Sequence, residues 1–251
     1  MTKRAVVRRG NIVERSAPYN APAIHAYLLA LRDHGFEGAP IPIGSTENGR
    51  ERMTFIPGDV AVPPYEHQDW ALGLDSLASV GRLLRQFHEA SAATSAARCA
   101  DDWPRTLADP HVGPSEKTVL CHNDVSMANV VFRDGRAVAL IDFDMSAPGR
   151  PVWDVAVAAR YWAVHAQPES AAERLRVLAD SYGLSGESRA QLPATLEQVF
   201  EVARSVVAAR VAEGDPRFVT LLDTRGGWQR WDRVQAWLVD NRDVFAAALF
   251  D

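Results

Sequence analysis

Residues 118–148, TVLCHNDVSMANVVFRDGRAVALIDFDMSAP, place acid, amide and imidazole groups between short apolar runs. The three apolar runs, each typical of a buried strand, lie at 119–121, 130–132 and 138–141. Asp134-Gly135 between the last two predicts a hairpin. Such a hairpin brings the polar residues before its first strand close to those after its second. Two carboxylates and an amide are therefore expected to meet at one edge, which favours a divalent cation site.

The polar residues of this stretch have a specific spacing. His122-x-Asp124-x4-Asn129, followed by a strand that ends in an Asp, matches the catalytic loop of protein kinases. In that loop the Asp accepts the proton of the substrate hydroxyl and the Asn holds Mg²⁺. Here the chain reads HND where protein kinases have HRD, and DFD at 142–144 stands in place of DFG.

The DFD variant is followed by APG at 147–149 and PxxDVA at 151–156. With these motifs the chain resembles the aminoglycoside phosphotransferase and choline kinase group of small-molecule kinases. The resemblance is strongest over 122–154, weaker over 8–58 and architectural beyond that. It implies an α+β, bilobal protein-kinase-like fold, with a small antiparallel-sheet N-lobe containing one helix and a larger, mainly helical C-lobe.

The resemblance also implies roles for the polar residues. Asp124 is expected to be the catalytic base, and His122 to order the loop by hydrogen bonding. Asn129 and Asp142 are expected to hold Mg²⁺, because carboxylate and amide oxygens are hard donors that suit this ion. Asp144 either assists the metal or faces solvent. The expected cofactors are ATP or GTP with Mg²⁺.

Residues 1–58 are expected to form the N-lobe that covers the nucleotide. Strand signals flank the turn at 10–11, helical spacing covers 22–34, and a second hairpin covers 41–56. Arg15 falls where the family has a lysine that pairs with phosphate, and His25 falls near the family's glutamate partner. Arginine can fork onto phosphate oxygens, although an exposed strand cation explains Arg15 equally well.

A segment dense in Pro and Gly at 59–64 predicts the hinge between the lobes. The family binds the adenine edge at such a segment, so Phe55, Ile56 and Gly58 are expected in the base pocket. The C-lobe is expected to occupy 65–251, with helices over 69–90, 152–166, 175–182, 192–210 and 228–249. His88 is expected to be a structural histidine. Asp154 either complements a helix dipole or braces the catalytic loop.

Composition excludes several classes of protein. The 251 residues are 47% hydrophobic with 27 basic and 32 acidic residues, so the chain can build a full core and has no basic footprint for nucleic acid. Neither a signal peptide nor a stretch of 18 apolar residues is visible, which predicts a cytoplasmic protein without membrane contact. Its Cys99 and Cys121 make no disulfide framework. A monomer or a dimer is expected.

The predicted function is transfer of the γ-phosphate of a nucleoside triphosphate to a hydroxyl of a small acceptor. The main alternative is a kinase-like protein that binds nucleotide or ligand without turnover, favoured by Arg15 and by the lack of an acid near His25. A loop whose Asp and Asn only satisfy turn backbones is a weaker alternative. A metallohydrolase is weaker as well, because the other histidines are scattered.

The identity of the acceptor is left open by the sequence. Six acids of the late helices would suit a polyamine such as an aminoglycoside: Glu187, Glu197, Glu201, Glu213, Asp232 and Asp240. Interleaved arginines and solvated helix faces explain these acids as well. Trp228, Trp231 and Trp237 could bind a cation through their rings or form a buried helix stripe. An antibiotic-resistance role and a metabolic role both remain open.

Overall fold

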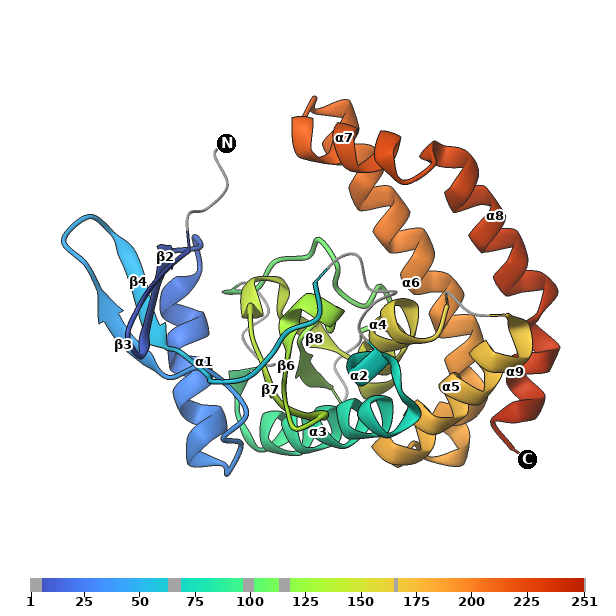
Figure 1. Cartoon of the computed structure of the whole chain (residues 1–251), viewed down its shortest axis with the longest axis horizontal. Coiled ribbons are helices and arrows are strands. Elements are labelled where there is room, and N and C mark those ends of the chain that lie inside the picture. Colours follow the sequence, from blue (N-terminus) through green and yellow to red (C-terminus); the bar gives the residue numbers. More distant parts are fainter. Residues whose placement is uncertain (1–5, 63–68, 97–101, 113–117, 165–166, 251) are drawn as a thin grey trace.

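The computed structural model describes residues 6–62, 69–96, 102–112, 118–164 and 167–250. Figure 1 shows a small sheet with one helix at one end of the molecule and a larger group of helices at the other. We call these parts the N-lobe and the C-lobe. The predicted α+β, bilobal fold is confirmed.

The N-lobe is a four-stranded antiparallel sheet with the strand order β1-β2-β4-β3. Its elements are β1 (Val7–Arg9), β2 (Ile12–Ser16), α1 (Ala21–Asp33), β3 (Pro42–Ser45) and β4 (Arg50–Thr54). The predicted order of strand, strand, helix, strand and strand is confirmed, and residues 1–5 lie outside the described residues. In the register of β2 and β4, Arg15 stands opposite Glu51.

Helix α1 begins where the sequence predicts, with a proline in its first turn, where the missing N–H costs no hydrogen bond. One face of the helix, formed by Ile24, Tyr27, Leu28 and Leu31, is buried in the core. Spacing of three and four residues places these side chains on the same face. The helix thereby ties the small sheet to the C-lobe.

Two short antiparallel strand pairs carry the central motif in the C-lobe. Strand β5 (Val119–Cys121) pairs with β8 (Ala147–Gly149), and β6 (Val130–Arg133) pairs with β7 (Arg136–Leu140). Asp134 and Gly135 both have positive φ, as a tight hairpin turn requires. The predicted hairpin is confirmed, whereas β8 was not expected.

The helices of the C-lobe are α2 (Asp69–Leu72), α3 (Leu74–Ala93), α4 (Pro151–Trp162), α5 (Pro168–Tyr182), α6 (Gly186–Ala212), α7 (Pro216–Thr224), α8 (Gly227–Asp240) and α9 (Arg242–Ala248). Two single helices predicted from periodicity are wrong, because each is divided. The backbone is extended at Gly73, between α2 and α3, and leaves helical geometry at Asn241, between α8 and α9. Helix α7 was not expected, although the Asp215 side chain caps it.

The remaining boundaries differ by smaller amounts. Helix α4 ends at Trp162, short of the predicted 166, and residues 165–166 lie outside the described residues. Helices α5 and α6 both begin earlier than predicted. The hydroxyl of Ser185 accepts a hydrogen bond from the Ser188 backbone N–H and so caps the start of α6.

The segment between the lobes is held by the backbone. Asp59 and Phe132 exchange N–H to carbonyl hydrogen bonds of 2.8 and 2.7 Å. A side chain at Gly58, whose φ is +149°, would place its Cβ 2.4 Å from the Phe132 carbonyl oxygen. Only glycine fits this approach. Residues 63 and 64 of the predicted hinge lie outside the described residues.

A continuous core lies beneath the central motif. Its largest buried side chains include Trp153, Trp162, Phe87, Phe132 and Phe143. The Phe143 ring lies 4.7 Å from the ring of His122 and 6.5 Å from that of Tyr27. The aromatic residue of the DFD segment thus fixes the end of β7 against the catalytic loop. Among the described residues, no helix combines the length and apolarity needed to cross a membrane.

Candidate active site

Asp124 lies in the loop after β5 and is held by two side chains. The Tyr161 hydroxyl donates to its Oδ1 (3.0 Å), and Asn129 Nδ2 donates to its Oδ2 (2.8 Å) and to its backbone carbonyl (3.0 Å). Burial raises the pKa of Asp124, and the nearby His122 and the Tyr161 hydrogen bond offset this only in part. A carboxylate held in this way can still accept a further proton or hydrogen bond.

The His122 ring connects the loop to the end of β7. Its Nε2 donates to the Ile141 carbonyl oxygen (3.1 Å), while its Nδ1 accepts from the Asp124 backbone N–H (3.3 Å). Both contacts require the same neutral tautomer, with the proton on Nε2. His122 therefore orders the backbone of Asp124, and its ring nitrogens have no capacity left for proton transfer.

Asp154, in the first turn of α4, anchors the start of the catalytic loop. Its Oδ2 accepts from the His122 backbone N–H (2.6 Å) and from His88 Nε2 (3.0 Å), and its Oδ1 accepts from the Asn123 backbone N–H (2.8 Å). His88 Nδ1 in turn accepts from the Tyr182 hydroxyl (2.8 Å). We call this buried set the Asp154 brace. Asp154 thus does more than complement a helix dipole, and His88 is a structural histidine as predicted.

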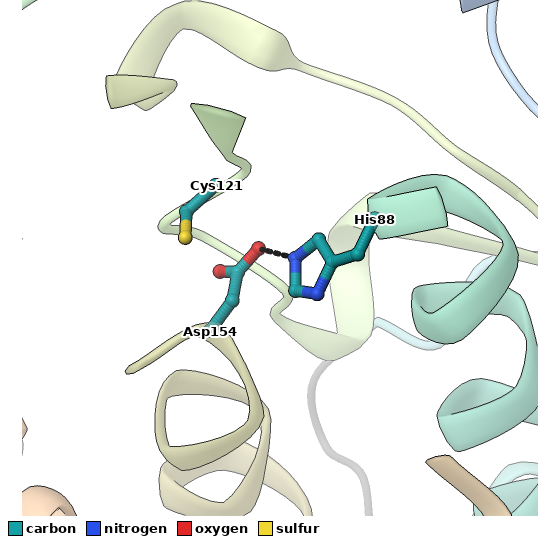
Figure 2. Close-up of side chains that lie close together, drawn as sticks. All are labelled: His88, Cys121 and Asp154. Atoms are coloured by element: carbon teal, nitrogen blue, oxygen red, sulfur yellow. Dashed lines mark hydrogen bonds and ion pairs between the residues drawn. The ribbon is translucent and has the colours of Figure 1, made fainter. Parts of the chain in front are cut away.

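Figure 2 shows that Cys121 lies beside His88 and Asp154, and the possible ligand atoms of the three lie within 4.8 Å of one another. Metal binding would require these atoms to be free and deprotonated. Instead, both Asp154 oxygens accept backbone hydrogen bonds. The Cys121 thiol donates to the Arg150 carbonyl oxygen (3.5 Å), and burial raises its pKa. The three side chains therefore form part of the Asp154 brace.

The charge of the brace follows from its hydrogen bonds. Burial alone would raise the pKa of Asp154, but the hydrogen bond from His88, the proximity of the His88 and His122 rings and the hydrogen bond from the His122 backbone outweigh burial and lower it. Asp154 therefore remains a carboxylate although it is fully buried.

Asn129 and Asp142 are brought together by the hairpin of β6 and β7. The Ile141 backbone N–H donates to the Asn129 carbonyl oxygen (2.9 Å), which places Asp142 next to Asn129. Because Asn129 Nδ2 is directed to Asp124, its Oδ1 is directed away and can bind a cation. Asp142 has a left-handed backbone (φ 66°), which is uncommon for a residue with a side chain, and its side chain is 47% exposed.

Arg15 joins the lobes by contacting three carboxylates. It donates to Glu51 (2.5 Å) and to Asp142 (2.7 Å), and it also forms an ion pair with Asp144. Burial alone would lower the pKa of Arg15, but the three carboxylates raise it. We call these four residues the Arg15 cluster. The interpretation of Arg15 as an exposed strand cation is wrong, since its side chain is 14% exposed.

The expectation that Arg15 lacks an acidic partner near His25 is also wrong. Glu51, which is fully buried on β4, accepts from Arg15 and lies 2.9 Å from His25 Nε2. The partner therefore comes from a neighbouring strand and not from α1. Glu51 and Met53 are the two buried positions of β4, so an acid at an inward position of an alternating strand was the available signal. The predicted hairpin at 41–56 includes residue 51, but no role was expected for it.

A cavity of about 330 Å³ lies between the lobes. Its lining includes six residues predicted for the site: Arg15, Phe55, Ile56, Gly58, Asn129 and Asp142. Most of the other lining side chains are apolar, and its volume falls within the range of small-molecule sites. His122, Asp124 and Asp144 do not line this cavity. A wider hollow of about 710 Å³ includes only Ile56 of the predicted residues.

Tyr161 is a site residue that the sequence did not reveal. It lies in the last turn of α4, and its hydroxyl contacts Asp124. Burial, together with the charge of Asp124, raises the pKa of Tyr161 to about 12, so the hydroxyl is a neutral donor. Within an apolar helical segment, nothing in the local pattern marks this residue as functional.

Comparisons with known proteins agree with this geometry. Residues 92–193 match the Phosphotransferase enzyme family. The trifolitoxin immunity protein of Rhizobium leguminosarum bv. trifolii is 26% identical over 270 residues, which cover 97% of this chain and 94% of that protein.

Solved structures of kinases share the fold. A choline/ethanolamine kinase family protein from Mesorhizobium loti has a TM-score of 0.66 at 16% identity, covering 97% of this chain and 88% of that one. A microcompartment-associated aminopropanol kinase has a TM-score of 0.60 at 15% identity, covering 98% and 90%. A spectinomycin phosphotransferase in complex with ADP and spectinomycin has a TM-score of 0.58 at 13% identity, covering 97% and 88%.

The fold is thus shared with solved structures of small-molecule kinases, and residues 92–193 are similar to the Phosphotransferase enzyme family. The predicted resemblance to the aminoglycoside phosphotransferase and choline kinase group is confirmed by the family match and by these neighbours.

Proposed function

We propose that the protein transfers the γ-phosphoryl group of ATP or GTP to a hydroxyl of a small acceptor. The main support for the proposal is the set of hydrogen bonds that holds the Asp124 carboxylate. One of its oxygens is held by Tyr161 and the other by Asn129, which also borders the cavity between the lobes. A carboxylate fixed by a residue that borders a small-molecule cavity suits a catalytic base in phosphoryl transfer.

In the proposed reaction, one bond to the γ-phosphorus forms as another breaks. The acceptor oxygen forms a bond to the γ-phosphorus while the bond from that phosphorus to the β–γ bridging oxygen breaks. The hydroxyl proton passes to Asp124, and a nucleoside diphosphate leaves. Asp124 is suited to this role because burial raises its pKa toward that of a useful base.

The nucleotide base is proposed to occupy the apolar part of the cavity, against Phe55, Ile56 and Gly58. The phosphates would then face Arg15 at the polar end. A spectinomycin phosphotransferase with a similar fold is known in complex with ADP, and an aminoglycoside 2'-phosphotransferase in complex with GDP. Both purine nucleotides are therefore included in the proposal.

Mg²⁺ is proposed to bind Asn129 and Asp142, with help from Asp144. The residues fit this ion, because an amide oxygen and two carboxylates provide hard donors while open positions remain for water and phosphate. Asn129 Oδ1 is directed away from Asp124, and Asp142 is half exposed. Mg²⁺ bound there would neutralise charge on the phosphates.

One observation favours binding without turnover as a second candidate function. Arg15 contacts both Asp142 and Asp144, so it competes with Mg²⁺ for the same carboxylates. If Arg15 kept these contacts with nucleotide bound, Asp142 and Asp144 could not bind Mg²⁺. Transfer therefore requires Arg15 to exchange these carboxylates for phosphate oxygens.

The acceptor and the biological role are part of the proposal. The relatives are named for choline or ethanolamine, aminopropanol and spectinomycin, and one is named an immunity protein. These names support a small alcohol, and they include antibiotics and toxins among the classes to be tested. Because nucleoside triphosphates are available in the cytoplasm, we place the reaction there.

The test is a screen of alcohol-bearing acceptors with ATP or GTP and Mg²⁺. The acceptors include aminoglycosides, macrolides, peptide antibiotics, amino alcohols, sugars and hydroxy acids. Mass spectrometry is expected to detect one added phosphoryl group on at least one acceptor, together with an equal amount of nucleoside diphosphate. Tight, metal-dependent nucleotide binding without a phosphorylated acceptor would favour binding without turnover. Absence of nucleotide binding would reject both functions.

A further inference from the structure

The surface next to Asp124 carries a cation that the phosphoryl-transfer chemistry does not use. Arg160 Nη1 donates to the Tyr161 hydroxyl (3.3 Å), and this hydroxyl donates to Asp124 (3.0 Å). The guanidinium is therefore two hydrogen bonds away from the proposed base. An acceptor whose hydroxyl reaches Asp124 must place its neighbouring groups close to Arg160.

Three aromatic rings hold the Arg160 guanidinium. Its Cζ lies 4.9 Å from the ring centroid of Tyr161, 5.5 Å from that of Phe200 and 5.6 Å from that of Trp231. Ring faces stabilise a cation but accept no strong hydrogen bond from its N–H groups. The rings therefore fix the position of the charge without saturating its donors.

Most donors of Arg160 have no partner among the described residues. A guanidinium has five N–H groups, and only the contact with the Tyr161 hydroxyl is formed among the residues that the structure describes. Within the same part of the chain, Arg160 forms no ion pair with a carboxylate. A half-buried, prepositioned arginine with open donors is suited to a carboxylate, whose two oxygens match the guanidinium fork.

Beyond Arg160, helices α6 and α8 place a further arginine beside an aromatic ring. Helix α6 packs against both α4 and α8, as Figure 1 shows. One turn after Phe200 on α6, Arg204 lies 5.5 Å from the Trp228 ring of α8, and it pairs with Asp232 (2.5 Å). The surface is thus aromatic, and its local acid is already neutralised.

Among the described residues, none of the acids that suggested a polyamine site contacts Asp124. Three of them are paired with arginine: Glu197 with Arg242, Glu213 with Arg210, and Asp232 with Arg204. The other three, Glu187, Glu201 and Asp240, are exposed positions of α6 and α8. Beside Asp124, a polycation would therefore meet the positive charge of Arg160.

From this geometry we infer that the acceptor is an alcohol that also carries an anionic group, most simply a carboxylate, next to an apolar or aromatic portion. Arg160 binds the anionic group, and the rings of Phe200 and Trp231 contact the apolar portion. The inference rests on the proposed function and narrows it. It predicts discrimination against aminoglycosides and choline, because their positive charges would lie against Arg160.

The test uses matched ligands that differ in charge. N-benzoyl-L-serine and N-benzoyl-L-serinamide share a hydroxyl and a ring, and only the first carries a carboxylate; choline and an aminoglycoside supply cations. Binding is measured by calorimetry with the full chain, Mg²⁺ and a non-hydrolysable ATP analogue. We expect the carboxylate ligand to bind about tenfold more tightly than its amide, as a charge-assisted hydrogen bond provides.

Two variants assign the preference to Arg160. Arg160→Gln is expected to reduce it to less than about threefold, and Arg160→Lys to restore part of it, because lysine keeps the charge but not the fork. Arg210→Gln is the matched control, since Arg210 is an exposed arginine near the end of α6. It is expected to bind all the ligands like the wild type.

Four outcomes would overturn the inference: equal affinity for acid and amide, tighter binding of the cations, an unchanged preference in Arg160→Gln, or no binding of any ligand while the nucleotide analogue is bound. Failure of the wild type to bind the nucleotide analogue with Mg²⁺ would instead reject the proposed function. The nucleotide titration therefore distinguishes the two failures.

Discussion

The Asp154 brace and the Arg15 cluster contain similar groups but differ in what those groups can do. In the Asp154 brace, a fully buried carboxylate accepts two backbone N–H groups and one imidazole. In the Arg15 cluster, Asp142 is 47% exposed and its observed partner is one side chain on the other lobe. Breaking the first leaves buried donors without partners, whereas solvent and ligands can replace the second. A structural acid is therefore buried with its hydrogen bonds filled by the protein, whereas a candidate ligand-binding acid is exposed and keeps room for further partners.

The largest expected effect breaks the Asp154 brace. Asp154→Asn places an amide N–H₂ group against a backbone N–H, and loss of one partner of a buried charged network costs about 3–5 kcal/mol of unfolding free energy. Urea unfolding at pH 7 measures this difference. Asp180→Asn removes an exposed acid paired with Arg189 and is expected to cost less than about 1 kcal/mol. Equal effects of the two changes would contradict the distinction.

The difference in unfolding free energy between the wild type and Asp154→Asn is also expected to depend on pH. Because the folded state lowers the pKa of Asp154, its contribution to stability is present above the ordinary value of about 3.9 and is lost as pH falls through the folded pKa. The stability difference between the wild type and Asp154→Asn should be constant from about pH 7 to 5 and shrink below about pH 4. Urea unfolding across this range checks it. An increase in this difference as pH falls below about 6 would instead mean that the folded state raises the pKa of Asp154.

The next effect concerns the proposed metal site. Asp142→Ala removes a carboxylate whose loss should leave folding intact, because this side chain is half exposed. The Mg²⁺-dependent part of nucleotide affinity is expected to fall by a factor on the order of 10², which matches a charged ligand lost from the site. Calorimetry with and without Mg²⁺ measures it. Unchanged metal dependence would remove Asp142 from the site.

Arg15→Gln should have the smallest of these effects. It removes a phosphate contact but also frees Asp142 and Asp144 for Mg²⁺, so nucleotide affinity is expected to fall only about tenfold. Arg9→Gln is the matched control, because Arg9 is a 75% exposed arginine of the same hairpin. Wild-type affinity in Arg15→Gln would show that Arg15 only ties the lobes together.

The sequence predicted those parts of the site that are close in the chain. His122, Asp124 and Asn129 share one loop, and the turn at Asp134-Gly135 is local chemistry that brings Asp142 to Asn129. These features depend on spacing and turn preference alone. The described elements also follow the predicted order within the N-lobe.

The missed features depend on contacts between distant segments. Glu51 becomes the partner of Arg15 through the register of two strands 36 residues apart, and Tyr161 reaches Asp124 across 37 residues. Arg160 of α4 contacts the rings of Phe200 and Trp231 because α6 and α8 pack nearby in the fold. Periodicity shows that a face is apolar but not which side chain lies opposite, so these contacts could not be predicted from pattern.

Asp124→Ala tests whether Asp124 is the base for phosphoryl transfer. Nucleotide affinity and transfer to the acceptor found by mass detection are measured on the same preparation under single-turnover conditions. We expect nucleotide affinity within about threefold of the wild type and transfer reduced by a factor on the order of 10² or more, as loss of a general base requires. Transfer above roughly a tenth of the wild-type rate would contradict the assignment of Asp124.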